Sequence, residues 1–297
     1  MAEWTIIGVP TSAGAHHAGL ERAPAALREA GLADRLTEVG AKVTDAGDLP
    51  GATFAVDRDH PGARNAGAVI RVAREVADAV AGVLVAGGRP LVLGGDCTII
   101  LGVIAGFRQL YPDVGLAYVD GDADLGADDS PGILDSLVVA HLLGYGVPEL
   151  AGLAGPPPLL KPARLAMIGA DLRGLTSDQR QRLADAKVSL ADSGELSADP
   201  EGTARRGLAA LAGPGGPIAP LVVHFDADVV DSGDLPLGNF PHYGSGVLLA
   251  HAVRCLRLLL ADPACACLVL TEVNPTYDPD GSLLDRYCAG VAAAMTE

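Results

Sequence analysis

The sequence has few basic residues and few aromatic ones. Lys and Arg together number 21 against 37 Asp and Glu, which gives a formal net charge of −16 at pH 7, and aromatic residues make up 4%. Nucleic acids and anionic membranes attract clustered Lys and Arg. The composition therefore argues against either as a partner, and its negative field favours a small cationic ligand.

Long apolar runs and a disulfide framework are also missing. No uninterrupted apolar stretch reaches the ~18 residues of a membrane span, and the first four residues carry no basic segment ahead of an apolar one. The five cysteines are odd in number, which fits reduced thiols better than disulfides. We therefore expect a cytoplasmic protein that does not bind membranes.

Apolar segments of strand type alternate with Ala- and Leu-rich helical segments, and hydrophobic residues make up 49% of the chain. This alternation is typical of a parallel sheet covered by helices on both faces. We predict one α/β domain over residues 1–297, a three-layer α/β/α structure with a mostly parallel central sheet.

The predicted strands are residues 4–9, 91–93, 115–119, 164–168, 221–225 and 267–270. The predicted helices are residues 24–30, 66–86, 135–143, 177–184, 247–260 and 283–294. Residues 152–158 and 213–220 are rich in Pro and Gly, and we interpret them as loops within the domain because the alternation resumes after each.

Two of these strands run directly into closely spaced acids. Asp120, Asp122 and Asp124 follow one strand, and Asp226 and Asp228 follow another. Residues two apart in an extended chain share a face, so each set should point one way. Carboxylates that close raise one another's pKa values and need a compensating cation. Because ligands bind at the carboxyl ends of parallel strands, the pattern predicts a metal-centred hydrolase site.

Four separated motifs make a resemblance specific. They are Gly-Gly-Asp-Cys at 94–97, the acids of 120–124, the acids of 226–231 and Thr-Glu-Val-Asn-Pro at 271–275. In this order they resemble the ureohydrolase superfamily, which includes arginase, agmatinase and formiminoglutamase, and the resemblance spans nearly the whole chain. It implies an arginase-like fold, two divalent metal ions with manganese expected, and a homo-oligomer, a trimer or hexamer.

Three positions depart from the pattern of that superfamily. Cys97 and Asp122 stand where a metal-binding histidine is usual, and Asp135 aligns with a histidine that helps to move protons. Thiolate and carboxylate are both competent ligands, so each replacement keeps a donor atom. Thiolate favours zinc or iron over manganese more than imidazole does, so zinc or iron is an alternative metal.

By the same resemblance, each predicted site residue has a role. One ion would take Cys97 and Asp120, the other Asp122 and Asp228, and both would share Asp124 and Asp226 as bridging ligands. Asp135 would pass a proton to the departing amine, and Glu272 would accept hydrogen bonds from a guanidinium group.

The predicted ligand set carries more negative charge than the one it resembles. Four carboxylates and two neutral imidazoles balance two divalent ions, whereas five carboxylates and a thiolate leave two further negative charges. That excess should raise the pKa of a metal-bound water. We expect a metal-activated hydroxide to cleave a linear C–N bond of a guanidino or amidino compound, more slowly or with a more alkaline optimum than in a histidine-liganded relative.

Other interpretations of single residues remain open. Cys97 could be a buried cysteine of the core, the acid sets could be turn-forming residues, and a helix cap is as good an interpretation of Asp135 as a catalytic group. We interpret His224 as a core histidine that faces away from Asp226. His16 and His17 are expected to be exposed to solvent.

Two further functions compete with an ordinary ureohydrolase. The chain could be a catalytically inactive arginase-fold protein that lost its histidine ligands and acts as a binding or assembly unit. It could also be a related hydrolase with a single metal and another substrate. We favour the active enzyme because every replacement keeps a polar donor atom.

Overall fold

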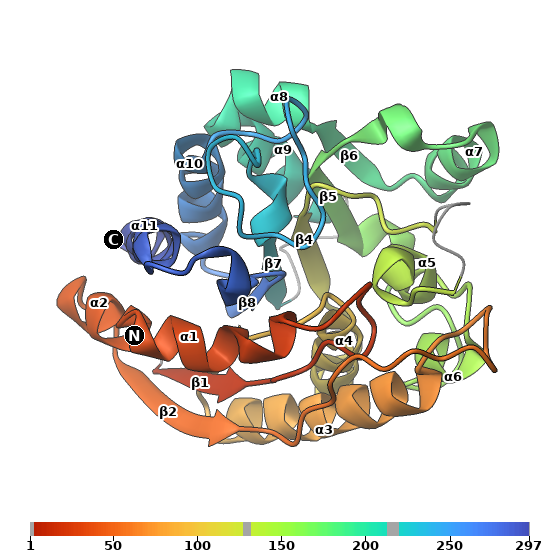
Figure 1. The fold of residues 1–297 in the computed structure, drawn as a ribbon. Helices are drawn as coiled ribbons and strands as arrows, with labels where there is room; N and C mark the ends of the chain where they lie inside the picture. The colour runs from red at the N-terminus through yellow and green to blue at the C-terminus, as the bar shows by residue number, and fades with distance from the viewer. Residues whose placement is uncertain (1–2, 127–131, 213–219, 297) are drawn as a thin grey trace.

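The computed structural model describes residues 3–126, 132–212 and 220–296 (Figure 1). Within these ranges, eight strands form one sheet in the order β2-β1-β3-β8-β7-β4-β5-β6, and every neighbouring pair is parallel. The strands are β1 Trp4–Gly8, β2 Val43–Asp48, β3 Arg89–Leu93, β4 Gly115–Val119, β5 Leu165–Ala170, β6 Ser189–Asp192, β7 Leu221–Asp226 and β8 Cys265–Thr271. The predicted α/β architecture with a parallel sheet is confirmed.

Alternate side chains of the inner strands enter two separate hydrophobic cores, one on each face of the sheet. Leu91 and Leu93 of β3 belong to one core and Val92 to the other. The first core is covered by α1 Ala23–Glu29, α2 Leu32–Glu38, α8 Ser193–Ala198, α9 Pro200–Ala212, α10 Leu249–Leu260 and α11 Ser282–Ala294. The second is covered by α3 Ala66–Val85, α4 Ile99–Arg108, α5 Val138–Leu142, α6 Pro148–Ala151 and α7 Ser177–Ala186. Burial on both faces explains why the inner strands are continuously apolar.

All six predicted strands are present, with ends within two residues of those expected. The prediction missed β2 and β6, the two edge strands, because neither has an apolar run. Residues of β2 after Val43 are exposed to solvent. The predicted helix at 135–143 is a 3₁₀ turn, Asp135–Leu137, followed by the short helix α5. Residues 152–158 form the predicted loop, whereas residues 213–219 of the other predicted loop lie outside the described ranges.

The cysteines and the helices bear on two expectations from composition. All five cysteines are buried and unpaired, which agrees with the expected reduced thiols. Among the described residues, no helix combines the length and the apolar character that a membrane crossing requires.

The strand order brings the predicted motifs together. β8 and β7 lie between β3 and β4 in the sheet, so the carboxyl ends of these four strands are neighbours. The Gly-Gly-Asp-Cys turn, both acid sets and Glu272 each follow one of them directly. Parallel pairing therefore gathers residues from four distant parts of the sequence at one edge of the sheet.

Helices α3 and α4 pack closely at a glycine. A Cβ added to Gly102 would lie 2.4 Å from the carbonyl oxygen of Ala73 and 2.8 Å from Cβ of Val76. We expect Gly102→Ala to lower the free energy of unfolding by about 1–3 kcal/mol, because the two helices must move apart. The control is Gly82→Ala, also within a helix, where an added Cβ meets nothing within 4 Å. That variant should gain about 0.5–1 kcal/mol. Urea denaturation measures both, and equal stability of the two variants would contradict the close helix contact.

Candidate metal centre

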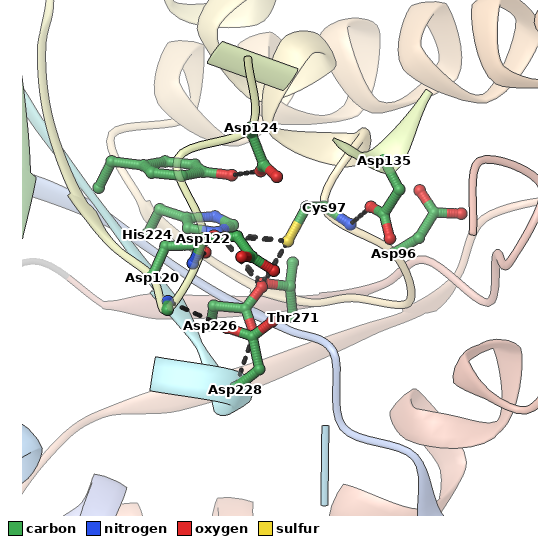
Figure 2. A network of polar contacts seen from close by, with 12 residues as sticks. Asp96, Cys97, Asp120, Asp122, Asp124, Asp135, His224, Asp226, Asp228 and Thr271 are labelled. Atoms are coloured by element: carbon green, nitrogen blue, oxygen red, sulfur yellow. Dashed lines mark hydrogen bonds and ion pairs between the residues drawn. The ribbon is translucent and has the colours of Figure 1, made fainter. Parts of the chain in front are cut away.

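A cavity lies at the carboxyl ends of β3, β4, β7 and β8. Its lining includes every residue that the sequence predicted as a metal ligand or catalytic group, together with His16, Ser136, Asn239 and Phe240. The predicted residues are Cys97, Asp120, Asp122, Asp124, Asp135, Asp226, Asp228 and Glu272. The structure thus brings the whole predicted set to one place, and Figure 2 shows all of these residues except Glu272.

Four buried side chains form what we call the first cluster: Cys97, Asp120, His224 and Asp226. Their donor atoms all lie within 4.8 Å of one another. Sγ of Cys97 lies 3.5 Å from Nε2 of His224 and 4.0 Å from Oδ2 of Asp120, and it donates a hydrogen bond to Asp226. Nε2 of His224 lies 3.5 Å from Asp120 and 3.9 Å from Asp226. A thiol, an imidazole and two carboxylates thus converge on one point.

The prediction that His224 faces away from Asp226 is wrong. The two residues are two apart in β7, so their side chains project from the same face of the strand. The His224 ring also stacks on the ring of Tyr118 in the paired strand β4, with centroids 4.3 Å apart and planes 6° apart. Counting the strand period from Asp226 would have placed this histidine in the site.

The second cluster consists of Asp122, Asp228 and His242. Nε2 of His242 lies 3.5 Å from Asp122 and 3.9 Å from Asp228. Oδ1 of Asp228 accepts a hydrogen bond of 3.1 Å from the Gly121 N–H, which ties the two acid loops together. Sequence analysis missed His242, because it lies in the loop between β7 and α10 and no strand period fixes its direction.

Asp124 lines the cavity but belongs to neither cluster. Its Oδ2 accepts a hydrogen bond of 2.5 Å from the Tyr118 hydroxyl, and its backbone has a φ of 45°, in the left-handed region. Figure 2 shows this carboxylate turned toward the tyrosine. A bridging role for Asp124 stays a prediction.

Asp135 and Glu272 lie together on the other side of Cys97. Their carboxyl oxygens and the Cys97 sulfur lie within 4.8 Å of one another. Oδ1 of Asp135 accepts a hydrogen bond of 2.8 Å from the Cys97 N–H, so it holds the Gly-Gly-Asp-Cys turn and makes no helix-cap hydrogen bond. Oε1 of Glu272 is buried and has no hydrogen-bond partner among the described residues.

Burial and mutual repulsion raise the pKa values of these acids. Burial, reinforced by the charge of Asp122, raises the pKa of Asp120 to about 7. Burial, reinforced by the charge of Asp120, raises the pKa of Asp228 to about 8. Burial raises the pKa of the Cys97 thiol well above its ordinary value, and the charge of Asp226 adds to this effect. The thiolate needed for metal binding therefore forms only when a cation takes the place of the proton.

The remaining polar residues around the site have structural contacts. Asp96 accepts hydrogen bonds from the backbone N–H groups of Gly14 and Thr98. His141 is buried, with Nδ1 2.6 Å from the Leu137 carbonyl oxygen and Nε2 accepting from the Val147 N–H. His16 is half-buried at the cavity, not exposed as expected, and its Nε2 lies 3.3 Å from the Ser136 hydroxyl.

A parallel α/β sheet whose strand ends bring acids, a thiol and two imidazoles into a buried cavity is the architecture of a metallohydrolase. A sequence model of the arginase family matches residues 2–296. The chain therefore belongs to the arginase family, which confirms the ureohydrolase prediction.

Individual relatives agree over the full length of the chain. The chain is 31% identical over 281 residues to an arginase of Brevibacillus brevis, covering 92% of this chain and 91% of that one. Its structure is similar to the crystal structure of arginase from Bacillus cereus, with a TM-score of 0.86, 27% identity, and coverage of 100% and 99%. Arginase from Bacillus caldovelox gives a TM-score of 0.87 at 25% identity, with the same coverage.

The raised pKa values predict how pH affects the metal-free protein. Burial alone would lower the pKa of His242, but the carboxylates of Asp122 and Asp228 raise it to about 9. Asp120, Asp228 and His242 bind protons more tightly in the folded chain than in the unfolded one. Burial lowers the pKa of His224 to about 3, so this one group acts in the opposite direction, and the two acids together outweigh it. The folded state therefore holds more protons between about pH 4 and pH 9, and the free energy of unfolding must fall as pH rises through that range.

We expect the chelated protein to melt at a lower temperature at pH 8.5 than at pH 5.5, because the site acids lose their protons while buried together. Asp228→Asn should flatten this dependence, whereas Asp34→Asn, a change to an exposed acid of α2, should leave it unchanged. Differential scanning calorimetry measures the effect. A melting temperature that rises with pH in the chelated wild type would contradict the electrostatic account.

Proposed function

We propose that this chain is a metal-dependent amidinohydrolase that cleaves a linear C–N bond in a guanidino or amidino compound. The observation that carries the proposal is that two donor clusters meet Glu272 at one cavity of an arginase-family chain, where Oε1 of Glu272 has no hydrogen-bond partner among the described residues.

The donor atoms fit divalent metal ions. Like-charged carboxylates are buried together, and Nε2 of His242 is buried beside two of them without a hydrogen-bond partner among the described residues. Cys97 and Asp120 would hold one ion and Asp122 and Asp228 the other, with Asp124 and Asp226 as the predicted shared ligands. Bound ions would supply Lewis acidity and lower the pKa of water at the site. Manganese is expected from the family, and the sulfur ligand favours zinc or iron.

Glu272 supports the proposed class of substrate. A guanidinium group is a planar cation with several N–H donors, and a carboxylate is its best-matched acceptor. Oε1 of Glu272 offers that acceptor inside the cavity, and the surrounding acids favour a cation over a neutral molecule. We therefore assign to Glu272 the binding of the amidino or guanidino group.

Asp135 supports the proposed proton transfer. Burial is the main cause that raises the pKa of its carboxyl group well above the ordinary value, and the charge of Asp96 adds to it, so the protonated form is favoured. A protonated carboxyl group near Glu272 can donate this proton to the departing amine.

The alternative of an inactive binding unit is not favoured, because the predicted acids and both predicted catalytic groups converge in one cavity. The single domain over residues 1–297, a cytoplasmic location and assembly into trimers or hexamers stay predictions from the sequence. The same holds for a more alkaline pH optimum than that of a histidine-liganded relative.

Glu272→Gln tests the assignment of the substrate site. Metal-loaded protein should release urea, ammonia or an amine from at least one of arginine, agmatine, hydroxyarginine, guanidinobutyrate and formiminoglutamate. A hydrogen bond to a charged group contributes about 1.5–3 kcal/mol, so Glu272→Gln should lower kcat/KM by roughly 10- to 150-fold. The matched control is Glu201→Gln, which alters a surface ion pair with Arg254 and should have no effect. Metal-loaded protein that hydrolyses none of the panel would contradict the substrate class.

Asp226→Ala tests the metal content. Oδ2 of Asp226 accepts a hydrogen bond from Cys97 in the first cluster, while its Oδ1 accepts one of 2.8 Å from the Asp228 N–H beside the second. The variant should therefore fall from about two bound ions per chain to fewer than one, measured by elemental analysis after incubation with manganese or zinc. Asp34→Asn serves as the control. Two ions retained by Asp226→Ala would contradict the shared role of this carboxylate.

A further inference from the structure

We infer that His224 and His242 are metal ligands, one in each cluster, and that they supply the imidazoles missing from positions 97 and 122. No motif of the chain predicts either residue in this role. The inference rests on the metal dependence of the proposed function and extends it to two residues of this chain.

The distances from His224 to the other donors of the first cluster fit one tetrahedral ion. Ligand atoms that lie about 2.0–2.3 Å from such an ion are roughly 3.3–3.8 Å apart. Nε2 of His224 lies 3.5 Å from Sγ of Cys97, 3.5 Å from Asp120 and 3.9 Å from Asp226. His224 therefore stands at ligand spacing from the other three donors, whereas Cys97 and Asp226, which share a hydrogen bond at 2.5 Å, would move apart around the ion.

The strand and its neighbours fix the direction of the His224 ring. Its stacking on Tyr118 blocks rotation, and its Nε2 lies 3.3 Å from the Thr271 hydroxyl at the end of β8. Nδ1 has no hydrogen-bond partner among the described residues, so stacking sets the orientation of the ring. His141 shows the contrast, because both of its ring nitrogens have backbone partners.

His242 has the geometry of a ligand in the second cluster. Its side chain is only 7% exposed, and Nε2 lies 3.5 Å from Asp122 and 3.9 Å from Asp228. That nitrogen has no hydrogen bond to any described residue. An imidazole nitrogen buried between two carboxylates, without a hydrogen bond to either, is placed to share a cation with them.

Each site then keeps one imidazole, carried by a different segment from that of the family motif. The first site joins sulfur, nitrogen and two carboxylates, a set that suits zinc or cobalt. The second site has one nitrogen among oxygen ligands, so it favours a harder metal ion than the first. The two ions are therefore held by chemically distinct sites.

Cobalt titration of the chelated full-length protein tests the assignment. Wild-type protein should bind two Co²⁺ per chain, and the first should show thiolate charge-transfer absorption in the near ultraviolet and strong tetrahedral bands in the visible. His242→Asn should weaken binding of the second ion by at least about 100-fold and leave the charge-transfer band intact, since even partners of ligands contribute about 10- to 100-fold. His224→Asn should weaken the first ion similarly and shift its visible bands.

His251→Asn, a change to a histidine of α10 outside both clusters, is the matched control and should bind both ions as wild type does. Because His224→Asn changes a fully buried position, X-ray absorption of wild-type protein with one equivalent of Zn²⁺ gives a second readout that does not depend on the variant. It should show both sulfur and imidazole scattering.

The outcomes separate the inference from the proposed function. The ligand assignment is overturned if both histidine variants bind Co²⁺ with the affinity and spectra of wild type, or if zinc binds to sulfur without imidazole. Either result leaves the proposed metal-dependent hydrolase intact. Two ions bound with the expected losses in the variants, but no hydrolysis of any amidino or guanidino compound, would support the ligands and overturn the proposed activity. A wild-type chain that binds no Co²⁺ would overturn both.

Discussion

Electrostatic repulsion among buried carboxylates is the constraint on which this molecule depends. Asp120, Asp226, Asp228 and Glu272 are all nearly excluded from water, and water is what normally separates charges of one sign. Two rigid hydrophobic cores hold the strands that carry them, so these groups cannot move apart. Protons or cations must therefore neutralise the cavity, and the choice between them depends on pH and on the supply of metal.

The backbone is strained where the strands end at the cavity. Asp124 and Glu272 adopt φ values of 45° and 58°, which cost non-glycine residues free energy. Both side chains line the cavity. Such strain persists only where the surrounding structure fixes the chain, and here the parallel strands on either side do so. Asn65 and Lys187 also have positive φ values, but they stand at the ends of helices α3 and α7, away from the cavity.

The inner fold and most of the site could be predicted from the sequence, because buried parallel strands are apolar and the acids follow them directly. The edge strands β2 and β6 could not, since strands exposed to solvent lack that pattern. His224 could have been placed by its spacing from Asp226, because residues two apart in a strand share a face. His242 could not, because a loop of the length between β7 and α10 has no periodicity, and its path is set only by contacts such as the Asp231 hydrogen bonds to Gly233 and Gly244.

The two clusters also differ in which part of the fold holds their donor atoms in place. The donors of the first come from strand ends and the turn after β3, so they are in position once the sheet has paired. The second needs His242, which lies in the long loop after β7. Asp231 holds this loop by accepting a hydrogen bond from the Gly244 N–H. A change that loosens this one loop would therefore disturb the second cluster and leave the donors of the first cluster in place.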